Sequence, residues 1–445
     1  MAKKEAEAMS LELLNEMNGR ACGCGKEHRF SAEVAVGRGV LERIPEFLEK
    51  FGAKKVYLLS DGNTWAAAGA RVYDIVTAAG VRCVSHCFSA SPEPDERAVG
   101  SAIMHFEGDC DLVMSVGSGV MNDIGKIVAA TAKRPYIIVG TAPSMDGYAS
   151  ATSSMTRDGL KISLNSKGAD VIIGDTEILR AAPLHMMKAG LGDMIAKYVS
   201  ICEWRIAHLV TGEYYCPQIA ALVRDAVKQC VDRADGLLRR EEEAVRAVFE
   251  GLVITGVAMN YAGLSRPASG VEHYISHCLD MRAVEFGTPM DLHGIQCAIG
   301  TRMAIGLYEK LKAVTPDREK ALAHAAAFDY GAWAAQLTRF LGRGAESMIA
   351  LEAREKKYDP QGHKARLEII LAHWDEILAI MAEELPTYGE ITQLLASIDA
   401  PKTLADIGIE ETLAPMLVRC TKDIRDKYVL TRLLWDLGIL EELLA

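Results

Sequence analysis

Three histidines and one aspartate in the second half of the chain have the types and spacing of a metal site. His273 and His277 lie four residues apart, so a helix would place both on one face. His293 follows far enough along for that helix to end and the chain to return to the same place. Asp193 stands within an otherwise apolar helical pattern, GDMIAK. Two imidazoles and one carboxylate leave coordination positions open, as in a catalytic metal site, although singly each group is more often a hydrogen-bonded core residue.

A second group of potential ligands lies near the start of the chain. Cys22, Cys24 and His28 offer two thiolates and one imidazole. A structural zinc site needs four ligands, and no Cys-x-x-Cys pair is present elsewhere in the sequence. The sequence therefore favours a segment without a structural metal.

Glycines in the first half of the chain indicate a phosphate-binding turn. The segment SVGSGVMND (115–123) follows an expected strand and opens an expected helix. Gly117 and Gly119 let the backbone approach a phosphate, and the N–H groups of the new helix can bind its charge. The Rossmann fingerprint is incomplete because Asn122 stands at its sixth position, so a simple tight turn is the alternative. Asp61, in SDGN at the end of an upstream strand, is placed to bind ribose hydroxyls.

A polar loop follows the next expected strand. The segment TAPSMDGYAS (141–150) is rich in hydroxyls and carries one carboxylate, Asp146. Open α/β sheets bind ligands at the carboxyl ends of their strands. This loop is therefore a candidate to line a polar substrate, and a capped turn is the alternative.

These segments sit in a chain whose two halves differ in pattern. Short apolar runs that predict strands alternate with helical periodicity, which is typical of a parallel sheet covered on both faces. The expected strands are 31–38, 54–60, 81–88, 111–117 and 135–141, with helices at 40–51, 63–79, 95–107 and 120–132. Further strands are expected around a turn at 157–159. From about residue 177 long helices are expected, for example 186–210, 217–238, 241–263 and 365–384.

The composition excludes several classes of protein. A chain of 445 residues suggests two or three domains. With 49 basic and 60 acidic residues its net charge is −11, which argues against nucleic acid or an anionic membrane as partner. No apolar run of transmembrane length and no secretory signal is found. The 11 cysteines are scattered as reduced core thiols would be, so we expect a cytoplasmic protein.

Taken together, the motifs GSGVMND, TAPSMDGYAS, GLGDMIAK, RPASGVEHYISH and DLHG resemble, in this order, one enzyme superfamily. It comprises the iron-containing alcohol dehydrogenases, glycerol dehydrogenases and dehydroquinate synthases, and the chain looks most like its bacterial sn-glycerol-1-phosphate dehydrogenases. The resemblance implies an α/β Rossmann-like domain followed by an all-α domain, with the active site in the cleft between them. We expect an N-terminal extension at 1–29, a dinucleotide-binding domain at 30–180 and a helical metal-binding domain at 181–445. A homodimer is also implied.

The resemblance also implies residue roles. Asp193, His273 and His293 would hold one divalent metal, and His277, Asp193 and Asp146 would contact substrate. The positions expected to bind NAD(H) or NADP(H) are Asp61, Asn63, Gly117, Ser118, Gly119, Val120, Met121, Asn122, Asp123, Thr141, Ala142, Pro143, Ser144 and Ser150. Lys197 stands where the four-ligand iron enzymes of this superfamily have a histidine. That difference disfavours the iron branch and leaves Zn²⁺, Ni²⁺ and Fe²⁺ open.

The implied reaction interconverts dihydroxyacetone phosphate and sn-glycerol 1-phosphate, with the metal as Lewis acid and His277 in the proton path. Arg266 is the first candidate to bind the substrate phosphate, ahead of Lys161 and Lys197, although it could equally fix the turn at Pro267. The alternatives are a dehydrogenase of glycerol, another polyol or a sugar phosphate, a lyase of the dehydroquinate synthase type, and a non-catalytic protein on the same fold. The choice between NADH and NADPH stays open.

Overall fold

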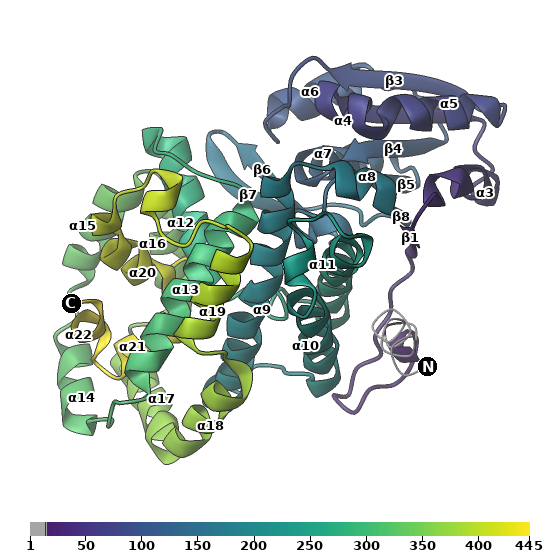
Figure 1. Cartoon of the computed structure of the whole chain (residues 1–445). Coiled ribbons are helices and arrows are strands. Elements are labelled where there is room, and N and C mark those ends of the chain that lie inside the picture. Colours follow the sequence, from purple (N-terminus) through teal and green to yellow (C-terminus); the bar gives the residue numbers. More distant parts are fainter. Residues whose placement is uncertain (1–13, 15) are drawn as a thin grey trace, which may run out of the picture. The chain divides into compact units, whose positions relative to one another are not determined.

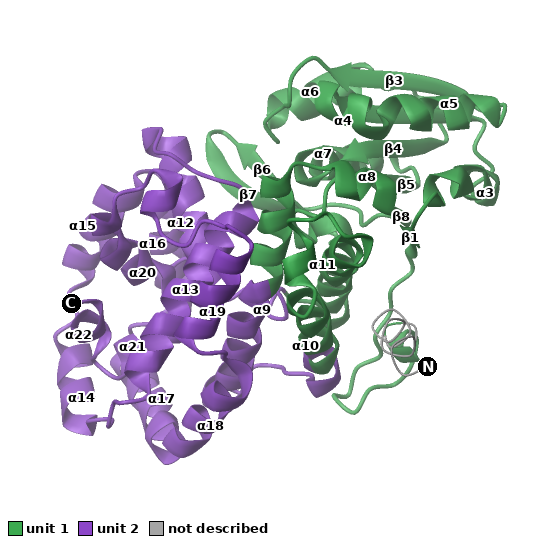
Figure 2. Ribbon diagram, viewed as in Figure 1, with its two compact units in different colours: residues 1–194, 221–264 green, residues 195–220, 265–445 purple. Residues whose placement is uncertain are grey.

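A computed structural model of the chain describes residue 14 and residues 16–445. The chain forms two compact units (Figure 2). Unit 1 contains the described residues up to 194 together with 221–264, and unit 2 contains 195–220 and 265–445. Much of the expected N-terminal extension, residues 1–13 and 15, lies outside the described residues. The domain limits expected from the sequence stay a prediction.

The main sheet of unit 1 is parallel throughout and has the strand order β1-β8-β5-β4-β2-β3 (Figure 1). All the strands expected before residue 142 form. The six strands are β1 (Glu33–Gly37), β2 (Lys55–Asp61), β3 (Arg82–Phe88), β4 (Leu112–Gly117), β5 (Tyr136–Gly140) and β8 (Val171–Asp175). The remaining two, β6 (Thr152–Arg157) and β7 (Leu160–Asn165), pair antiparallel as a hairpin. Asp158 and Gly159 turn this hairpin with positive φ angles of 53° and 72°, at the turn expected from the sequence.

The central strands are buried because helices cover the sheet on both faces. Val56 and Leu58 of β2 pack in an apolar cluster with Phe47 and Val72 from the helices of one face. Their neighbour Tyr57 points to the other face, where its hydroxyl donates a hydrogen bond to the Ala102 carbonyl. Alternate side chains therefore enter two different cores, which explains the continuous apolar runs of these strands.

Helices of unit 1 alternate with its strands. They are η1 (Val40–Arg43), α3 (Ile44–Lys50), α4 (Gly62–Thr64), the π-helical turn η2 (Trp65–Gly69), α5 (Ala70–Ala78), α6 (Glu96–Met104), α7 (Gly119–Ala132), η3 (Asp146–Tyr148), α8 (Thr176–Ala181), η4 (Ala234–Gly236) and α11 (Glu242–Ala262). Two further helices, α9 (Leu184–Thr211) and α10 (Pro217–Val231), run continuously from one unit into the other.

Unit 2 is helical. Its remaining elements are α12 (Val271–Phe286), α13 (His293–Leu311), α14 (Arg318–Ala326), α15 (Tyr330–Leu341), α16 (Gly344–Glu355), α17 (Pro360–Ala372), α18 (Trp374–Glu384), α19 (Tyr388–Ser397), η5 (Ala405–Ile407), η6 (Glu411–Leu413), α20 (Ala414–Thr421), α21 (Leu430–Asp436) and α22 (Leu440–Leu444). Within the described part of the chain, no helix is long and apolar enough to cross a membrane. An α/β sheet unit with a helical unit is the fold class expected from the sequence.

Candidate active site

The chain reverses direction across the sheet between β2 and β4, and the expected cofactor residues gather there. After β2 the chain adds β3 on one side and then returns to place β4 on the other, so the carboxyl ends of β2 and β4 flank a topological switch point. Dinucleotides bind at such points in open α/β sheets. Asp61 ends β2 and Gly117 ends β4. A Cβ atom built on Gly117 would lie 3.4 Å from Cγ2 of Thr64, so the two loops are in contact.

Asp61 and Asn63 both contact the loop that follows β3. The Asp61 carboxylate accepts a hydrogen bond from the backbone N–H of Thr64, which caps α4, and another from the Ser91 hydroxyl. Asn63 donates its side-chain N–H to the same hydroxyl. Ser91 stands in a loop without a recognisable motif, so the sequence alone did not indicate it. These side chains form a polar rim at the carboxyl end of β2.

Two glycines allow α7 to start close to the end of β4. A Cβ on Gly117 would lie 2.5 Å from Cβ of Met121, so only glycine lets the helix turn here. A Cβ on Gly125 would lie 2.1 Å from the Ser115 hydroxyl oxygen, so this glycine brings the helix body against the strand. Close helix–strand packing is the role of the third glycine of the Rossmann fingerprint. It falls here at Gly125, three residues beyond the position occupied by Asn122.

The first turn of α7 divides the expected cofactor residues into two groups. The Ser118 side chain does not cap the helix and instead hydrogen bonds with the Ser144 hydroxyl, at the edge where a phosphate is expected. Asn122 is buried and donates to the Gly147 carbonyl. Asp123 accepts from the Ser154 N–H, and burial raises the pKa of its carboxyl despite the neighbouring Lys126. The side chains of Asn122 and Asp123 thus stabilise the protein interior around the phosphate turn.

Lys126 is a positioning residue that the sequence analysis missed. Its fully buried ammonium donates to the carbonyls of Gly147 and Thr152, at 2.7 and 3.0 Å, and pairs with Asp123. Burial lowers its pKa, and the Asp123 carboxylate opposes that effect. The lysine therefore ties α7 to the loop 141–150. A single lysine in an apolar helical pattern gave no signal of this contact.

The loop 141–150 joins β5 to β6 and contacts α9 through Asp193. The Thr141 N–H donates to the Gly117 carbonyl, and the Tyr148 hydroxyl donates to the Ala142 carbonyl across the loop. The Asp146 N–H donates to Oδ2 of Asp193, at 2.9 Å. Asp193 is fully buried, and this bond fixes its carboxylate. The other three expected site residues of this loop are Pro143, Ser144 and Ser150.

Unit 2 places the three expected histidines together, near the starts of α12 and α13. The ring centroids of His273 and His293 lie 5.0 Å apart, and those of His277 and His293 lie 6.0 Å apart. His273 and His277 come from one face of α12, as their spacing predicted, and His293 is the first residue of α13. Potential ligand atoms of His273, His293 and Cys297 lie within 4.8 Å of one another.

Neighbouring side chains orient the two imidazoles. Nδ1 of His273 lies 2.8 Å from Oε1 of Glu272, and Nδ1 of His293 lies 3.0 Å from the Ser276 hydroxyl. With Nδ1–H as donor in each ring, Nε2 carries the free lone pair. Metal-binding histidines show this arrangement, in which a partner holds one nitrogen so that the other can bind the ion. The donor set therefore fits a divalent cation.

Cys297 was not selected from the sequence. It lies one helical turn after His293, and its Sγ is 3.5 Å from Nε2 of that residue. Although burial acts to raise it, the pKa of the Cys297 thiol is lowered by His273 and His293. The four-residue spacing of His293 and Cys297 in HGIQC was the available signal. It was missed because most cysteines of the chain lie in apolar segments, as Cys297 does. This thiol adds a soft potential ligand to the group.

Arg266 lies elsewhere in unit 2 and is already engaged. Its Nε and Nη2 donate to the two carboxylate oxygens of Glu213, and its Nη1 donates to the Tyr428 carbonyl. The side chain is fully buried. A paired guanidinium of this kind stabilises the turn before α12. The expected contact of Arg266 with a phosphate stays a prediction, and these hydrogen bonds argue against it.

Comparison with known proteins identifies the family. Residues 35–183 match the family model described as iron-containing alcohol dehydrogenase. The glycerol-1-phosphate dehydrogenase [NAD(P)+] of Methanosarcina barkeri is 37% identical over 279 residues, which cover 62% of this chain and 76% of the relative. This chain belongs to the glycerol-1-phosphate dehydrogenase family. The family's Halalkalibacterium halodurans member is 27% identical over 92% of this chain and 94% of its own.

A solved structure agrees with the fold of this family member. The iron-containing alcohol dehydrogenase of Thermococcus thioreducens superposes with a TM-score of 0.62 at 16% identity, covering 94% of this chain and 99% of that one. At this identity the likeness shows the fold alone. The family membership therefore rests on the sequence relatives.

Proposed function

We propose that this protein interconverts dihydroxyacetone phosphate and sn-glycerol 1-phosphate, using NAD(P)(H) and a divalent metal. The observation that carries the proposal is the 37% identity to a glycerol-1-phosphate dehydrogenase, over three quarters of that relative. The histidine group of unit 2 and the switch point of unit 1 supply the chemistry such an enzyme needs.

We propose that Asp193, His273 and His293 hold the metal. Two oriented imidazoles support this set, and so does the buried Asp193 carboxylate, whose Oδ2 is fixed by the Asp146 N–H. Two imidazoles and one carboxylate suit Zn²⁺, Ni²⁺ and Fe²⁺ alike. Cys297 would favour the thiophilic ions among them.

We propose that the cofactor lies along the carboxyl ends of β2, β4 and β5. Asp61 and Asn63 would face its ribose, the turn 117–121 its pyrophosphate, and 141–144 and Ser150 its nicotinamide half. The close approach of α7 to β4 supports this placement, because the N–H groups at the start of a helix bind phosphate. Asn122 and Asp123 would act here by shaping the turn.

When bound, the metal supplies Lewis-acid stabilisation to the ketone oxygen, and the nicotinamide supplies the hydride. We propose that His277 moves the proton between substrate oxygen and solvent, because its ring is stacked near His293 and is partly exposed. Asp146 would bind a substrate hydroxyl, since its backbone is fixed beside Asp193. The face of the ketone presented to the nicotinamide would set the handedness of the product.

The ligand set and the substrate are tested separately. His273→Ala and His293→Ala should each lose the metal and at least ~10²-fold in kcat/KM, whereas His185→Ala, a histidine near the start of α9, should keep both. Activity on dihydroxyacetone phosphate should exceed that on dihydroxyacetone. Full activity of His293→Ala would refute the ligand set. Preference for dihydroxyacetone would instead indicate a glycerol-type dehydrogenase, in agreement with the engaged state of Arg266.

We further propose that the enzyme works in the cytoplasm as a homodimer. None of the 11 cysteines, all of which lie in the described part of the chain, forms a disulfide, which suits a reducing compartment. The dimer is the expectation of the family, and size-exclusion chromatography with light scattering tests it.

A further inference from the structure

The segment around Cys22 is folded into a compact loop. Residues 21 and 27 form an antiparallel bridge, and the Cys22 N–H donates to the Lys26 carbonyl. Inside the loop the Gly25 N–H donates back to the Cys22 carbonyl, with Gly25 at a positive φ of 84°. This tight turn brings two cysteines and a histidine of the CGCGKEH sequence to one side.

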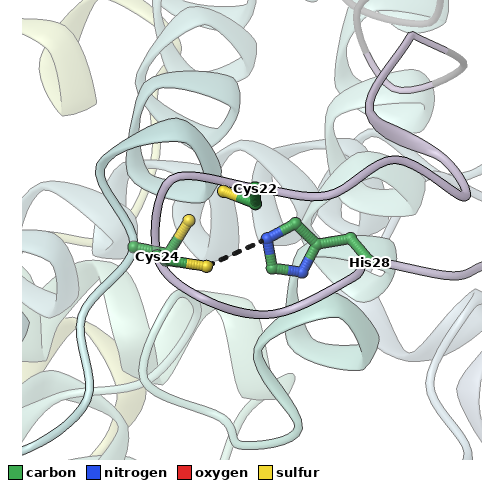
Figure 3. Close-up of side chains that lie close together, drawn as sticks. Cys22, Cys24 and His28 are labelled. Carbon is green, nitrogen blue, oxygen red and sulfur yellow. Dashed lines mark hydrogen bonds between the residues drawn. The ribbon is translucent and has the colours of Figure 1, made fainter.

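Figure 3 shows the Cys22, Cys24 and His28 side chains converging inside this loop. Sγ of Cys24 lies 3.5 Å from Nε2 of His28, and the ligand atoms of all three lie within 4.8 Å of one another. His28 is almost fully buried, at 1% exposed. Two thiols and an imidazole nitrogen thus face a common point.

The rest of unit 1 holds the histidine in the tautomer that a metal requires. Nδ1 of His28 lies 3.1 Å from the Tyr261 carbonyl, so Nδ1–H donates there and Nε2 keeps its lone pair toward the cysteines. The His28 ring also packs on the Tyr261 ring. Lys26 donates to the carbonyl of Ala262, the last residue of α11. Such outer contacts are typical of histidines that bind zinc.

We propose that Cys22, Cys24 and His28 hold a structural zinc ion, separate from the catalytic metal. Two thiolates and one imidazole supply three ligands of a tetrahedral site, and soft sulfur ligands select Zn²⁺. All three residues belong to unit 1.

The sequence alone favoured a segment without a structural metal. The convergence of the three side chains and the fixed tautomer of His28 are what the folded chain adds. The zinc would fasten the segment 19–30 to the end of α11. Its role is therefore stability rather than turnover.

Metal counting on the purified full-length enzyme tests the proposal. The wild-type protein should carry one zinc per chain beyond the ion lost in His273→Ala, and Cys22→Ser/Cys24→Ser should lose that zinc alone. The matched control, Cys83→Ser/Cys87→Ser, removes two cysteines of β3 and should lose none. The two metal assignments are tested independently, because His273→Ala should remove the catalytic ion and Cys22→Ser/Cys24→Ser should remove the structural zinc.

Cobalt substitution tests the ligands without relying on the double variant. Co²⁺ bound to His273→Ala protein, which lacks the catalytic ion, should give a tetrahedral spectrum with thiolate charge transfer, about half as strong in His273→Ala/Cys24→Ser. The loading should also raise thermal stability. No thiolate band in His273→Ala protein, or a zinc content unaffected by Cys22→Ser/Cys24→Ser, would overturn the site. An unchanged spectrum in His273→Ala/Cys24→Ser would overturn Cys24 as a ligand.

Discussion

Oε1 of Glu272 accepts hydrogen bonds from two neighbours, Nδ1 of His273 at 2.8 Å and the Gly270 N–H at 2.7 Å. The carboxylate is fully buried at the start of α12. It thereby holds the His273 ring at the angle that presents Nε2 to a metal. The imidazole also gains basicity from the adjacent negative charge.

Replacing Glu272 should weaken the binding of the metal without removing a ligand. In Glu272→Gln an acceptor oxygen remains but the charge is lost, so we expect metal affinity to fall about 10-fold, within the 10–100-fold range of such partners. Competition with a chelator measures this, and kcat should recover when excess metal is added. Glu352→Gln, a buried carboxylate that accepts from the Lys357 and Tyr358 N–H groups, is the control. Equal affinities in both variants would show that Glu272 does not orient the ligand.

Substituting Arg266 distinguishes a structural from a substrate-binding role. In Arg266→Ala, Glu213 and the Tyr428 carbonyl lose their partner, so we expect a stability loss of about 3 kcal/mol. At a temperature where the variant is folded, KM for dihydroxyacetone phosphate should stay within about 3-fold. Arg318→Ala breaks a more exposed pair with Glu368 and should cost less. A large rise in KM with stability intact would instead place Arg266 at the phosphate.

Glu203 makes stability depend on pH. Burial, with the charge of nearby Glu272, raises the pKa of the Glu203 carboxyl. Gly270 makes room for the pair, since a Cβ there would lie 2.5 Å from Oε2 of Glu203 and 2.7 Å from Oε2 of Glu272. An acid whose pKa is raised by folding contributes its full stability below its unfolded pKa. That contribution is lost as pH rises from there toward the folded pKa.

The change in the free energy of unfolding with pH is therefore the quantity to measure. Between about pH 5 and pH 8 the wild-type protein should lose about 2 kcal/mol relative to Glu203→Gln, by urea unfolding. In Glu203→Gln the amide nitrogen cannot accept a hydrogen bond from the Val271 N–H, so the variant is also destabilised by a constant amount. This amount does not depend on pH and therefore does not change the slope. Glu383→Gln, an exposed carboxylate of the same unit, should leave the slope unchanged. Parallel slopes for wild type and Glu203→Gln would show that Glu203 ionises normally.

Gly125→Ala should separate α7 from β4. Its Cβ would lie 2.1 Å from the Ser115 hydroxyl and 2.6 Å from that of Tyr136, so the helix must shift. We expect a stability loss of about 2 kcal/mol together with weaker NAD(P)H binding, measured by cofactor fluorescence. Gly100→Ala is the matched control, because a Cβ on this α6 glycine meets nothing within 4 Å. Unchanged cofactor affinity in Gly125→Ala would mean that the start of α7 does not bind the pyrophosphate.

Local pattern was enough to predict the strands of unit 1 and the helices between them. Apolar runs such as YIIVG at 136–140 are short and fully buried, so their type and bounds were clear. The expected helix 365–384 is instead two helices that meet at His373, where neither glycine nor proline marks the break. The π-helical turn Trp65–Gly69 within the expected helix 63–79 likewise has no sequence signal, because the apolar period is unchanged.

The candidate site was predictable where its groups share a motif. His273, His277 and His293 come together because one helix and its successor carry them. Lys126 and Glu203 were missed because each contacts a partner distant in sequence. A single charged residue in an apolar pattern does not indicate which residue that partner is. Such contacts arise only when the chain is folded.

The central claim is a metal-dependent reduction of a phosphorylated ketone. Its most direct test strips the enzyme of metal, reloads it with Zn²⁺, Ni²⁺ or Fe²⁺, and follows NADH and NADPH oxidation with dihydroxyacetone phosphate. We predict that activity returns with one divalent ion at the His273–His293 group and that the product is sn-glycerol 1-phosphate. Turnover by metal-free enzyme, formation of the opposite enantiomer, or no oxidation of either cofactor after reloading would contradict it.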